Sequence, residues 1–255
     1  MIQNKNTVIT GASESIGFAI AEKFVKNGAN VILISRNQNK LDEAAKALSK
    51  YGTEVHTIAK DLSNIESIKE LVCSINDIWS TIDVLVNNAG IALFDPMEDV
   101  KLDTLDLMIN LNVKAPFVLT QRLLPSIKKS KGNIINISSY FSDRMISGRP
   151  STVYSLTKGA INSLTKSLAN EIGNTGVRVN AIAPGSVNTS LLKKTVSQMT
   201  DPDKEKFEKT VSQIYPLGRI GQPDEIADLA IFLASENSQW MTGSIINLDG
   251  GLRTN

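Results

Sequence analysis

The sequence is poor in residues that carry disulfide, redox or metal chemistry, with one cysteine, Cys73, and one histidine, His56, among 255 residues. A single cysteine excludes an internal disulfide framework and fits a reducing compartment. Cys73 lies in an apolar-periodic stretch, so we expect its thiol to be buried and inert. His56 falls inside an expected strand, so the sequence gives little support for histidine acid–base chemistry and predicts no metal site.

Long apolar runs and an excess of one charge are also missing. No uninterrupted apolar run approaches the roughly 18 residues that a membrane helix needs. Basic residues number 27 against 26 acidic ones, so nothing indicates a nucleic-acid or membrane partner. The N-terminus runs directly into an expected strand, without a basic-then-apolar signal peptide. We therefore expect a cytoplasmic protein.

Short apolar runs alternate with longer helix-period segments along the chain. This alternation predicts βαβ units and a Rossmann-type, doubly wound α/β fold, with about seven parallel strands and helices on both faces. The expected strands are residues 7–10, 30–34, 54–59, 84–87, 134–137, 178–183 and 244–248. The expected helices include residues 17–26, 40–50, 65–78, 102–128, 154–172 and 224–234.

No repeat, low-complexity tract or linker divides the chain, so residues 1–255 are expected to form a single domain. Residues from about 184 to 215 depart from the alternation, because they are polar and charged with weak periodicity. Such a segment is either an ordinary surface excursion or a mobile lid. Its position just after the end of a strand favours a substrate lid around residues 186–215.

Tyr154 and Lys158 stand four residues apart in the sequence Y-S-L-T-K. In a helix this spacing places both side chains on one face, about one turn apart. The lysine ammonium is expected to favour the ionised phenol and so to lower the tyrosine pKa. Such a phenol can pass a proton to a carbonyl oxygen, or take one from an alcohol, near neutral pH. For this pair taken alone, a solvated helix face is the alternative.

A glycine-bearing turn, T-G-A-S-E-S-I-G, follows the first expected strand and opens a helix. Gly11 and Gly17 suit a tight turn and a helix N-terminus that receives a pyrophosphate. The second expected strand ends at Ser35 and Arg36, without the carboxylate that would accept bonds from a ribose 2′-hydroxyl. Arginine is suited to phosphate, so NADP(H) is favoured and NAD(H) is the alternative. Glu14, in the turn, argues weakly the other way because it repels an added anion.

Taken together, the motifs resemble those of the classical short-chain dehydrogenase/reductase family, from about residue 5 to residue 251. The turn resembles the family's T-G-x-x-x-G-x-G. The other matching motifs, in chain order, are N-N-A-G at 87–90, Asn112 in N-V-K-A-P-F, Ser139 in I-N-I-S-S, Y-x-x-x-K, P-G…T from Pro184 to Thr189, and D-G-G at 249–251. One departure is Ser15, which stands where the family usually has its middle glycine. Its side chain would either crowd the pyrophosphate or add a hydroxyl donor to it.

The resemblance implies a role for each of four catalytic residues. Tyr154 is the general acid/base, and Ser139 hydrogen-bonds the substrate oxygen as charge develops on it. Lys158 binds the nicotinamide ribose and depresses the tyrosine pKa, and Asn112 helps to hold a proton-relay water. For Ser139 the alternative is a strand-end serine that satisfies local backbone groups, and Ser138 next to it competes for the role.

The resemblance also implies the cofactor contacts. Asp61 and Leu62 lie at the adenine, Arg36 at the adenosine ribose, and Thr189 at the nicotinamide carboxamide. The full set is Gly11, Ser13, Ser15, Ile16, Gly17, Ser35, Arg36, Asp61, Leu62, Asn88, Ala89, Gly90, Tyr154, Lys158, Pro184, Gly185, Val187 and Thr189.

The sequence leaves the small-molecule substrate open. An NADPH-dependent ketoreductase, for example of a 3-oxoacyl thioester, is favoured by Arg36 and by the basic helix end at 128–131. This basic end either complements the helix dipole or docks an acidic carrier protein. A sugar, polyol or other secondary-alcohol dehydrogenase is the alternative. A nucleotide-binding regulatory protein without turnover is the third hypothesis. It is disfavoured because a non-catalytic binder has no chemical need for all four catalytic residues.

Two further features bear on the substrate and on partners. The connection at 140–153 carries Met145 and Ile146, which suit an apolar wall, and Arg144 and Arg149, which either steer an anionic substrate or solvate a loop. Members of the family are commonly dimers or tetramers built on the two long helices. The apolar surface of the helix at 154–172 suits a two-fold interface, and core packing is the competing account.

Overall fold

The computed structural model of the protein describes residues 2–254 and contains one sheet of seven strands. The strand order is β3-β2-β1-β4-β5-β6-β7, and all neighbours pair in parallel. The strands are β1 (Asn6–Thr10), β2 (Asn30–Ser35), β3 (Val55–Ala59), β4 (Val84–Asn87), β5 (Asn133–Ile137), β6 (Arg178–Pro184) and β7 (Ile245–Leu248). The predicted doubly wound α/β fold is confirmed, and each predicted strand bound lies within one residue of the observed one.

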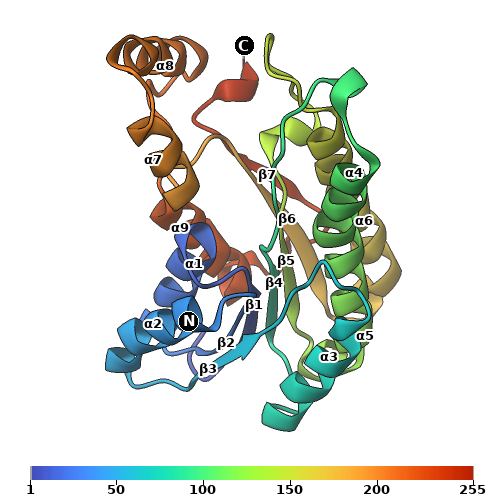
Figure 1. The fold of residues 1–255 in the computed structure, drawn as a ribbon. Helices are drawn as coiled ribbons and strands as arrows, with labels where there is room; N and C mark the ends of the chain where they lie inside the picture. Colours follow the sequence, from blue (N-terminus) through green and yellow to red (C-terminus); the bar gives the residue numbers. More distant parts are fainter. Residues whose placement is uncertain (1, 255) are drawn as a thin grey trace.

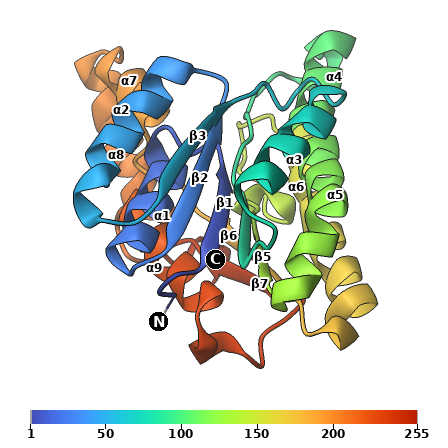
Figure 2. The same ribbon diagram turned by 90° about the horizontal axis from the view of Figure 1, so that it is seen from below.

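Helices cover both faces of the sheet (Figures 1 and 2). One face carries α1 (Ser15–Lys26), α2 (Gln38–Leu48) and α9 (Pro223–Ala234), and the other α3 (Ser67–Ile78), α4 (Leu102–Ile109), α5 (Ala115–Ser130) and α6 (Thr152–Ile172). Because both faces are covered, β4 and β5 are buried along their length, and β4 begins with the apolar run V-L-V. Each fully buried aliphatic side chain there contributes about 1.5–3 kcal/mol to the free energy of folding.

The long periodic stretch predicted at 102–128 is interrupted in the structure. α4 and α5 are joined by a π-helical turn, Asn110–Lys114, whose hydrogen bonds reach one residue further than those of an α-helix. Such single turns often occur at functional sites, and this one contains Asn112. Across residues 2–254, no helix combines the length and the apolar character needed to span a bilayer.

Residues 184–215, which show weak periodicity in the sequence, contain two helices that the sequence analysis did not predict. They are α7 (Ser190–Ser197) and α8 (Asp201–Ile214), and they lie beyond the end of β6 (Figure 1). Each begins with a threonine N-cap, Thr189 and Thr200, whose hydroxyl accepts a backbone hydrogen bond three residues on. Neither helix contains a buried residue, so no apolar stripe marks it in the sequence.

Cys73 is exposed, so the prediction of a buried thiol is wrong. The buried residues of α3 are Ile68, Leu71, Val72 and Ile75, which form one stripe at helical spacing. Cys73 follows Val72 by one residue and is therefore rotated by about 100° away from that stripe.

The strand order reverses at β1, which lies between β2 and β4. In parallel sheets of this kind, ligands bind in the crevice outside the carboxyl ends of the strands at such a switch point. The residues that follow β1, β4, β5 and β6 are therefore those that the fold brings to the site.

Candidate active site

The turn between β1 and α1 has the geometry of an anion-binding site. Gly11 has a φ of +66°, in the left-handed region that glycine adopts without strain. A Cβ on Gly17 would lie 2.2 Å from the carbonyl oxygen of Gly11, so only glycine fits there. The N-cap residue of α1, Glu14, makes no side-chain cap, which leaves the first-turn N–H groups directed at a ligand. These features fit a dinucleotide pyrophosphate.

Thr10 and Asn88 hold this turn against the loop that follows β4. The Thr10 hydroxyl accepts hydrogen bonds from the backbone N–H groups of Asn88 and Ala89, both at 3.0 Å. The Asn88 side-chain amide donates to the carbonyls of Thr10, at 2.9 Å, and Gly11, at 3.1 Å. The two predicted cofactor-binding segments are thus brought together. Thr10 is an organiser of the site that the sequence analysis did not assign.

Ser15 adopts the left-handed conformation, with a φ of +56°. Its Oγ accepts a hydrogen bond from the backbone N–H of Ser190 at 3.0 Å and donates to the Ser190 hydroxyl at 3.1 Å. The serine that replaces the family's usual glycine therefore connects the glycine turn to the first residue of α7. No sequence signal links two residues so far apart along the chain.

The end of β2, which the sequence predicts to contact the adenosine ribose, carries positive charge. Arg36 is exposed after β2, and the Ser35 hydroxyl accepts a bond from the Asn37 backbone N–H at 3.3 Å. Lys40, in the first turn of α2, forms an ion pair with Glu14 at 2.9 Å. The carboxylate that argued against a 2′-phosphate is therefore neutralised by a neighbouring cation.

Asp61 and Leu62, which follow β3, have different environments. Asp61 accepts bonds from the hydroxyl and the backbone N–H of Ser63, at 2.7 and 2.9 Å. These bonds, with a smaller effect from the Arg36 charge, hold the pKa of Asp61 below its ordinary value. Leu62 is buried.

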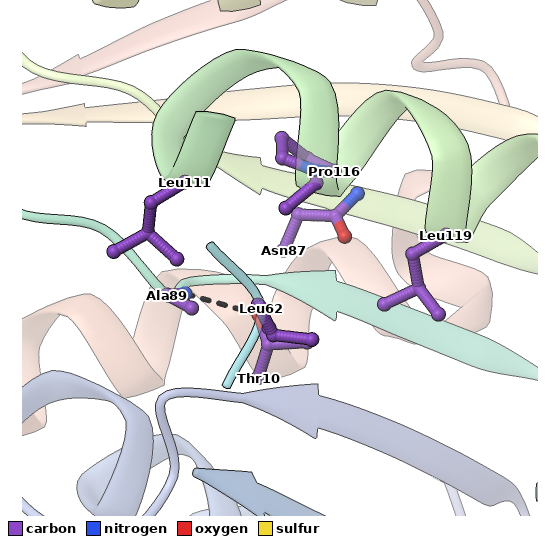
Figure 3. Close-up of a pocket in the computed structure, with 8 residues that line it drawn as sticks. Thr10, Leu62, Asn87, Ala89, Leu111, Pro116 and Leu119 are labelled. Atoms are coloured by element: carbon purple, nitrogen blue, oxygen red, sulfur yellow. Dashed lines mark hydrogen bonds between the residues drawn. The ribbon is translucent and has the colours of Figure 1, made fainter. Parts of the chain in front are cut away.

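A small hollow lies beneath the loop after β4 (Figure 3). The residues that line it are Thr10, Leu62, Asn87, Ala89, Leu111, Ala115, Pro116 and Leu119. The dashed line in Figure 3 marks the bond from the Ala89 backbone to the Thr10 hydroxyl. None of the four predicted catalytic residues lines this hollow, so we interpret it as a packing gap rather than as the substrate pocket.

Tyr154 and Lys158 lie on α6, and Ser139 follows β5. The Lys158 ammonium donates to the carbonyl of Ile137, the last residue of β5, at 2.8 Å and lies 5.7 Å from the centre of the Tyr154 ring. Ser139 and Tyr154 are hydrogen-bonded through their side chains. The structure therefore gathers the three predicted residues at the carboxyl edge of the sheet.

Burial dominates the titration of this pair. It raises the pKa of Tyr154 above its ordinary value, against the opposing effects of the Ser139 hydrogen bond and the Arg149 charge. Burial also lowers the pKa of Lys158 to about 8. The expectation that Lys158 lowers the tyrosine pKa is not met in this structure, because loss of hydration around the phenol outweighs the favourable interactions.

The two adjacent serines after β5 have separate partners. The Ser138 hydroxyl donates to the side-chain oxygen of Asn162 on α6 at 2.6 Å. The Ser139 hydroxyl accepts from the Phe141 backbone at 3.2 Å and bonds Tyr154. Of the two serines, Ser139 is thus the one bonded to Tyr154, whereas Ser138 is bonded to Asn162.

Asn112 is buried in the π-helical turn and braces the loop after β4. Its side-chain oxygen accepts from the Ile91 backbone at 2.9 Å, and its amide donates to the Ile91 carbonyl at 2.8 Å. The same amide donates to the hydroxyl of Thr157 on α6 at 3.2 Å. A Cβ on Gly90 would lie 3.1 Å from the Asn112 oxygen, so the loop approaches this side chain closely.

Arg253 is a residue near the C-terminus that the sequence analysis did not assign. Its guanidinium donates to the carbonyl of Ser139 at 3.1 Å and to the hydroxyl of Ser142 at 3.3 Å. It also pairs with Asp143 at 2.9 Å and lies 3.7 Å from a carboxylate oxygen of Asp249. Arg253 therefore clamps the Ser139 backbone to the D-G-G segment.

The segment after β6 is the one that the P-G…T motif predicts to contact the nicotinamide. Gly185 packs against Asp249, because a Cβ there would lie 3.0 Å from the Asp249 Cα. Val187 is buried and forms an isolated parallel bridge with Gly221. The Thr189 hydroxyl accepts the capping bond from the Leu192 backbone at 3.3 Å, which leaves its own proton for a ligand.

Comparisons with known proteins agree with this geometry. Residues 11–253 match the family model described as enoyl-(acyl carrier protein) reductase. The chain is 36% identical to the 3-oxoacyl-[acyl-carrier-protein] reductase of Thermotoga maritima, over 98% of each chain. It is 33% identical to a 3alpha-hydroxysteroid dehydrogenase of Mediterraneibacter gnavus, over 100% of this chain and 99% of that one.

Solved structures give the same result. The L-sorbose reductase of Gluconobacter frateurii, complexed with NADPH and L-sorbose, superposes with a TM-score of 0.94 at 31% identity, over 99% of this chain and 98% of that one. The resemblance noted in the sequence is thus confirmed across nearly the whole chain. The chain belongs to the short-chain dehydrogenase/reductase family and is an NAD(P)-dependent oxidoreductase that acts on alcohols or ketones.

Proposed function

We propose that the protein is an NADPH-dependent ketoreductase with Tyr154 as its general acid. The observation that carries this proposal is the cluster of Ser139, Tyr154 and Lys158 beside a turn shaped for a pyrophosphate. Asn112 supports the cluster from the π-helical turn. A 3-oxoacyl thioester is a candidate substrate, in keeping with the activity named for the Thermotoga maritima relative.

The proposed reaction converts a C=O group to CH–OH. The hydride for the carbonyl carbon would come from NADPH, which the glycine turn and Lys158 would hold. Tyr154 donates its phenolic proton to the carbonyl oxygen, and the Ser139 hydroxyl donates a hydrogen bond to the same oxygen as negative charge develops. Burial keeps the phenol protonated at neutral pH, which suits the reductive direction. Lys158, with a pKa of about 8, is mostly charged at pH 7 and is placed to hold the nicotinamide ribose.

The preference for NADPH rests on the charges around the end of β2. Arg36 supplies a guanidinium where a carboxylate would read the ribose 2′-hydroxyl. Lys40 adds a second cation in the first turn of α2 and neutralises Glu14. The L-sorbose reductase structure contains NADPH, which supports the same preference.

Oxidation of NADPH and of NADH, followed side by side with an acetoacetyl thioester as acceptor, tests the proposal. We expect turnover with NADPH preferred. An Arg36→Met variant should lose about tenfold or more in kcat/KM for NADPH and little for NADH, because one charge-assisted bond to phosphate is removed. An equal loss with both cofactors would contradict the role of Arg36. Arg122, exposed on α5, gives the matched control Arg122→Met.

The second candidate is a sugar or polyol dehydrogenase. It is favoured by the high structural similarity to L-sorbose reductase. L-sorbose and related ketoses as acceptors distinguish it, because turnover of a ketose without turnover of the thioester would replace the first candidate. Cofactor binding without turnover of any carbonyl would instead indicate a nucleotide-binding regulatory protein.

We also propose that residues 186–215, which include α7 and α8, form a lid over the substrate. The bonds between Ser15 and Ser190 place the start of α7 directly beside the glycine turn. A protease that cuts residues 186–215 should act more slowly once NADPH is bound. Equal cutting rates with and without NADPH would contradict this role.

A dimer or tetramer is the expected assembly. Two large apolar residues of the long helices are exposed: Phe117 on α5 is 49% exposed and Leu156 on α6 is 53% exposed. Ile161 and Ile172, by contrast, belong to the core. Light scattering that gives the mass of a monomer would remove this proposal. The cytoplasmic location stays a prediction.

A further inference from the structure

The rings of Phe94, Phe141 and Tyr154 pack against one another. The centres of Phe94 and Phe141 lie 5.6 and 5.7 Å from the centre of the Tyr154 ring, in edge-on arrangements. Phe94 and Phe141 are themselves 5.4 Å apart. Two segments, the loop after β4 and the connection after β5, thus form an aromatic wall beside the general acid.

Arg149 packs against two of these rings. Its guanidinium carbon is 4.8 Å from the centre of the Phe94 ring and 5.3 Å from that of Phe141. Such cation–π contacts hold a guanidinium in place and leave its edge N–H groups available. The position of the charge relative to Tyr154 is therefore fixed by the same rings that pack on the phenol.

The hydrogen-bonding capacity of Arg149 is largely unused. A guanidinium has five N–H donors, and the recorded bond is a long one, 3.4 Å, to the Tyr140 hydroxyl. Among residues 2–254, Arg149 forms no ion pair. Asp143, the acidic residue of the same connection, is paired with Arg253 instead. The arginine thus presents an uncompensated positive charge.

The Arg149 charge acts on the reacting group. It opposes the burial that raises the pKa values of Tyr154 and Tyr140. An anion bound to the guanidinium would therefore lie within electrostatic range of the phenol, and not on a remote surface.

We propose that Arg149 binds the carboxylate of the substrate, so that the substrate is an oxo acid and the product the corresponding hydroxy acid. The planar fork of the guanidinium matches a carboxylate in a bidentate arrangement. The guanidinium lies over the rings of Phe94 and Phe141, and these rings in turn pack on the Tyr154 ring. The proposal therefore places several bonds between the carboxylate and the reacting carbonyl of the substrate. This inference rests on the proposed ketoreductase function and narrows its substrate class.

A matched pair of acceptors tests the inference: 5-oxohexanoate and its methyl ester, with NADPH, on the intact protein. We expect the acid to be the better substrate. Arg149→Met removes the charge and leaves a shorter, unbranched apolar side chain beside the rings. It should lower kcat/KM for the acid by about tenfold or more, mainly through KM. The kcat/KM of Arg149→Met for the ester should stay within about twofold of the wild-type value. For the acid, the kcat/KM of Arg149→Lys should lie between those of the wild type and Arg149→Met.

The controls separate charge recognition from structure. Arg122→Met removes an exposed arginine on α5 and should change kcat/KM for neither the acid nor the ester. Equal losses for acid and ester in Arg149→Met would show that Arg149 only packs on the rings, and would overturn the inference. So would a wild-type preference for the ester.

Failure of the ketoreductase proposal gives a different pattern. The protein would then bind NADPH and reduce neither compound. In that case calorimetric titration of 5-oxohexanoate into the NADPH complex still decides the inference. Binding that is lost in Arg149→Met supports it, and absence of binding to the wild-type complex overturns it.

Discussion

The proposed catalytic floor and the proposed substrate rim of this site are built in opposite ways. The floor consists of Asn112, Ser139 and Lys158, which are 2%, 6% and 5% exposed. Their side chains bond to the backbone of Ile91, Phe141 and Ile137, respectively. The rim includes α7 and α8, which contain no buried residue. Stability therefore differs across the site, since segments with few buried contacts open at low free-energy cost.

The rim is attached at two points. At its start, Ser190 bonds to Ser15 in the glycine turn. At its end, the hydroxyl of the buried Tyr215 bonds to both the backbone and the hydroxyl of Ser186, each at 2.8 Å. The two helices between these points make few other ties to the sheet. The proposed function thus assigns proton transfer to the buried region and substrate entry to the loosely attached helices.

The largest effect is expected in the floor. Tyr154→Phe removes the proton donor and should lower kcat by about a thousandfold, within the range of general acid catalysis. NADPH affinity, measured by fluorescence titration, should stay within a few-fold because the ring remains. Tyr51→Phe, which removes a hydroxyl bonded to Glu22, is the matched control and should keep full turnover. Near-normal activity of Tyr154→Phe would overturn the assignment.

An intermediate effect is expected where the floor joins the C-terminal segment. Arg253→Met removes two bonds that position the Ser139 backbone and Ser142. We expect kcat to fall about tenfold with little change in the KM for NADPH, and Arg253→Lys to restore part of the loss.

Asp143→Asn provides the control for Arg253. This substitution removes the ion pair between Arg253 and the exposed Asp143 but leaves the bond from Arg253 to Ser139 in place, so kcat should change little. A lower melting temperature in Arg253→Met without a change in kcat would show a purely structural role.

The smallest effect is expected at the rim. Ser15→Gly removes both bonds to Ser190 and relieves the left-handed conformation, so the free energy of unfolding should change by only about 1 kcal/mol. Backbone amide exchange in α7 should nevertheless rise about threefold to tenfold, because the helix loses one of its ties. Ser190→Ala keeps the bond from its backbone and should show a smaller rise. Unchanged exchange in Ser15→Gly would contradict the role of this tie.

The sheet could be predicted closely from the sequence because its strands carry their own signal. The V-L-V run of β4 is apolar at each position, as a strand covered on both faces requires. The motif residues could be predicted as well, since Gly11, Gly17 and Tyr154 are fixed by short-range spacing.

The missed features lack such a signal. α7 and α8 bury nothing, so hydrophobic periodicity does not record them. The contacts of Ser15 with Ser190 and of Arg253 with Ser139 join residues more than a hundred positions apart, which no local pattern encodes. Cys73 is exposed because it lies one residue, or about 100° of helix rotation, beyond the buried Val72. Periodicity in the sequence did not resolve so small a difference.

The π-helical turn at Asn110–Lys114 has a consequence for how this chain can change during evolution. Such a turn equals an α-helix with one inserted residue, and each residue advances the helix by about 100°. Loss of that residue would straighten the path from α4 to α5 and rotate everything beyond it. Leu119, Leu123 and Ile127 would then turn out of the core together. The inserted residue is therefore retained because its loss would rotate the buried face of α5 away from the core. This constraint does not depend on the role of Asn112.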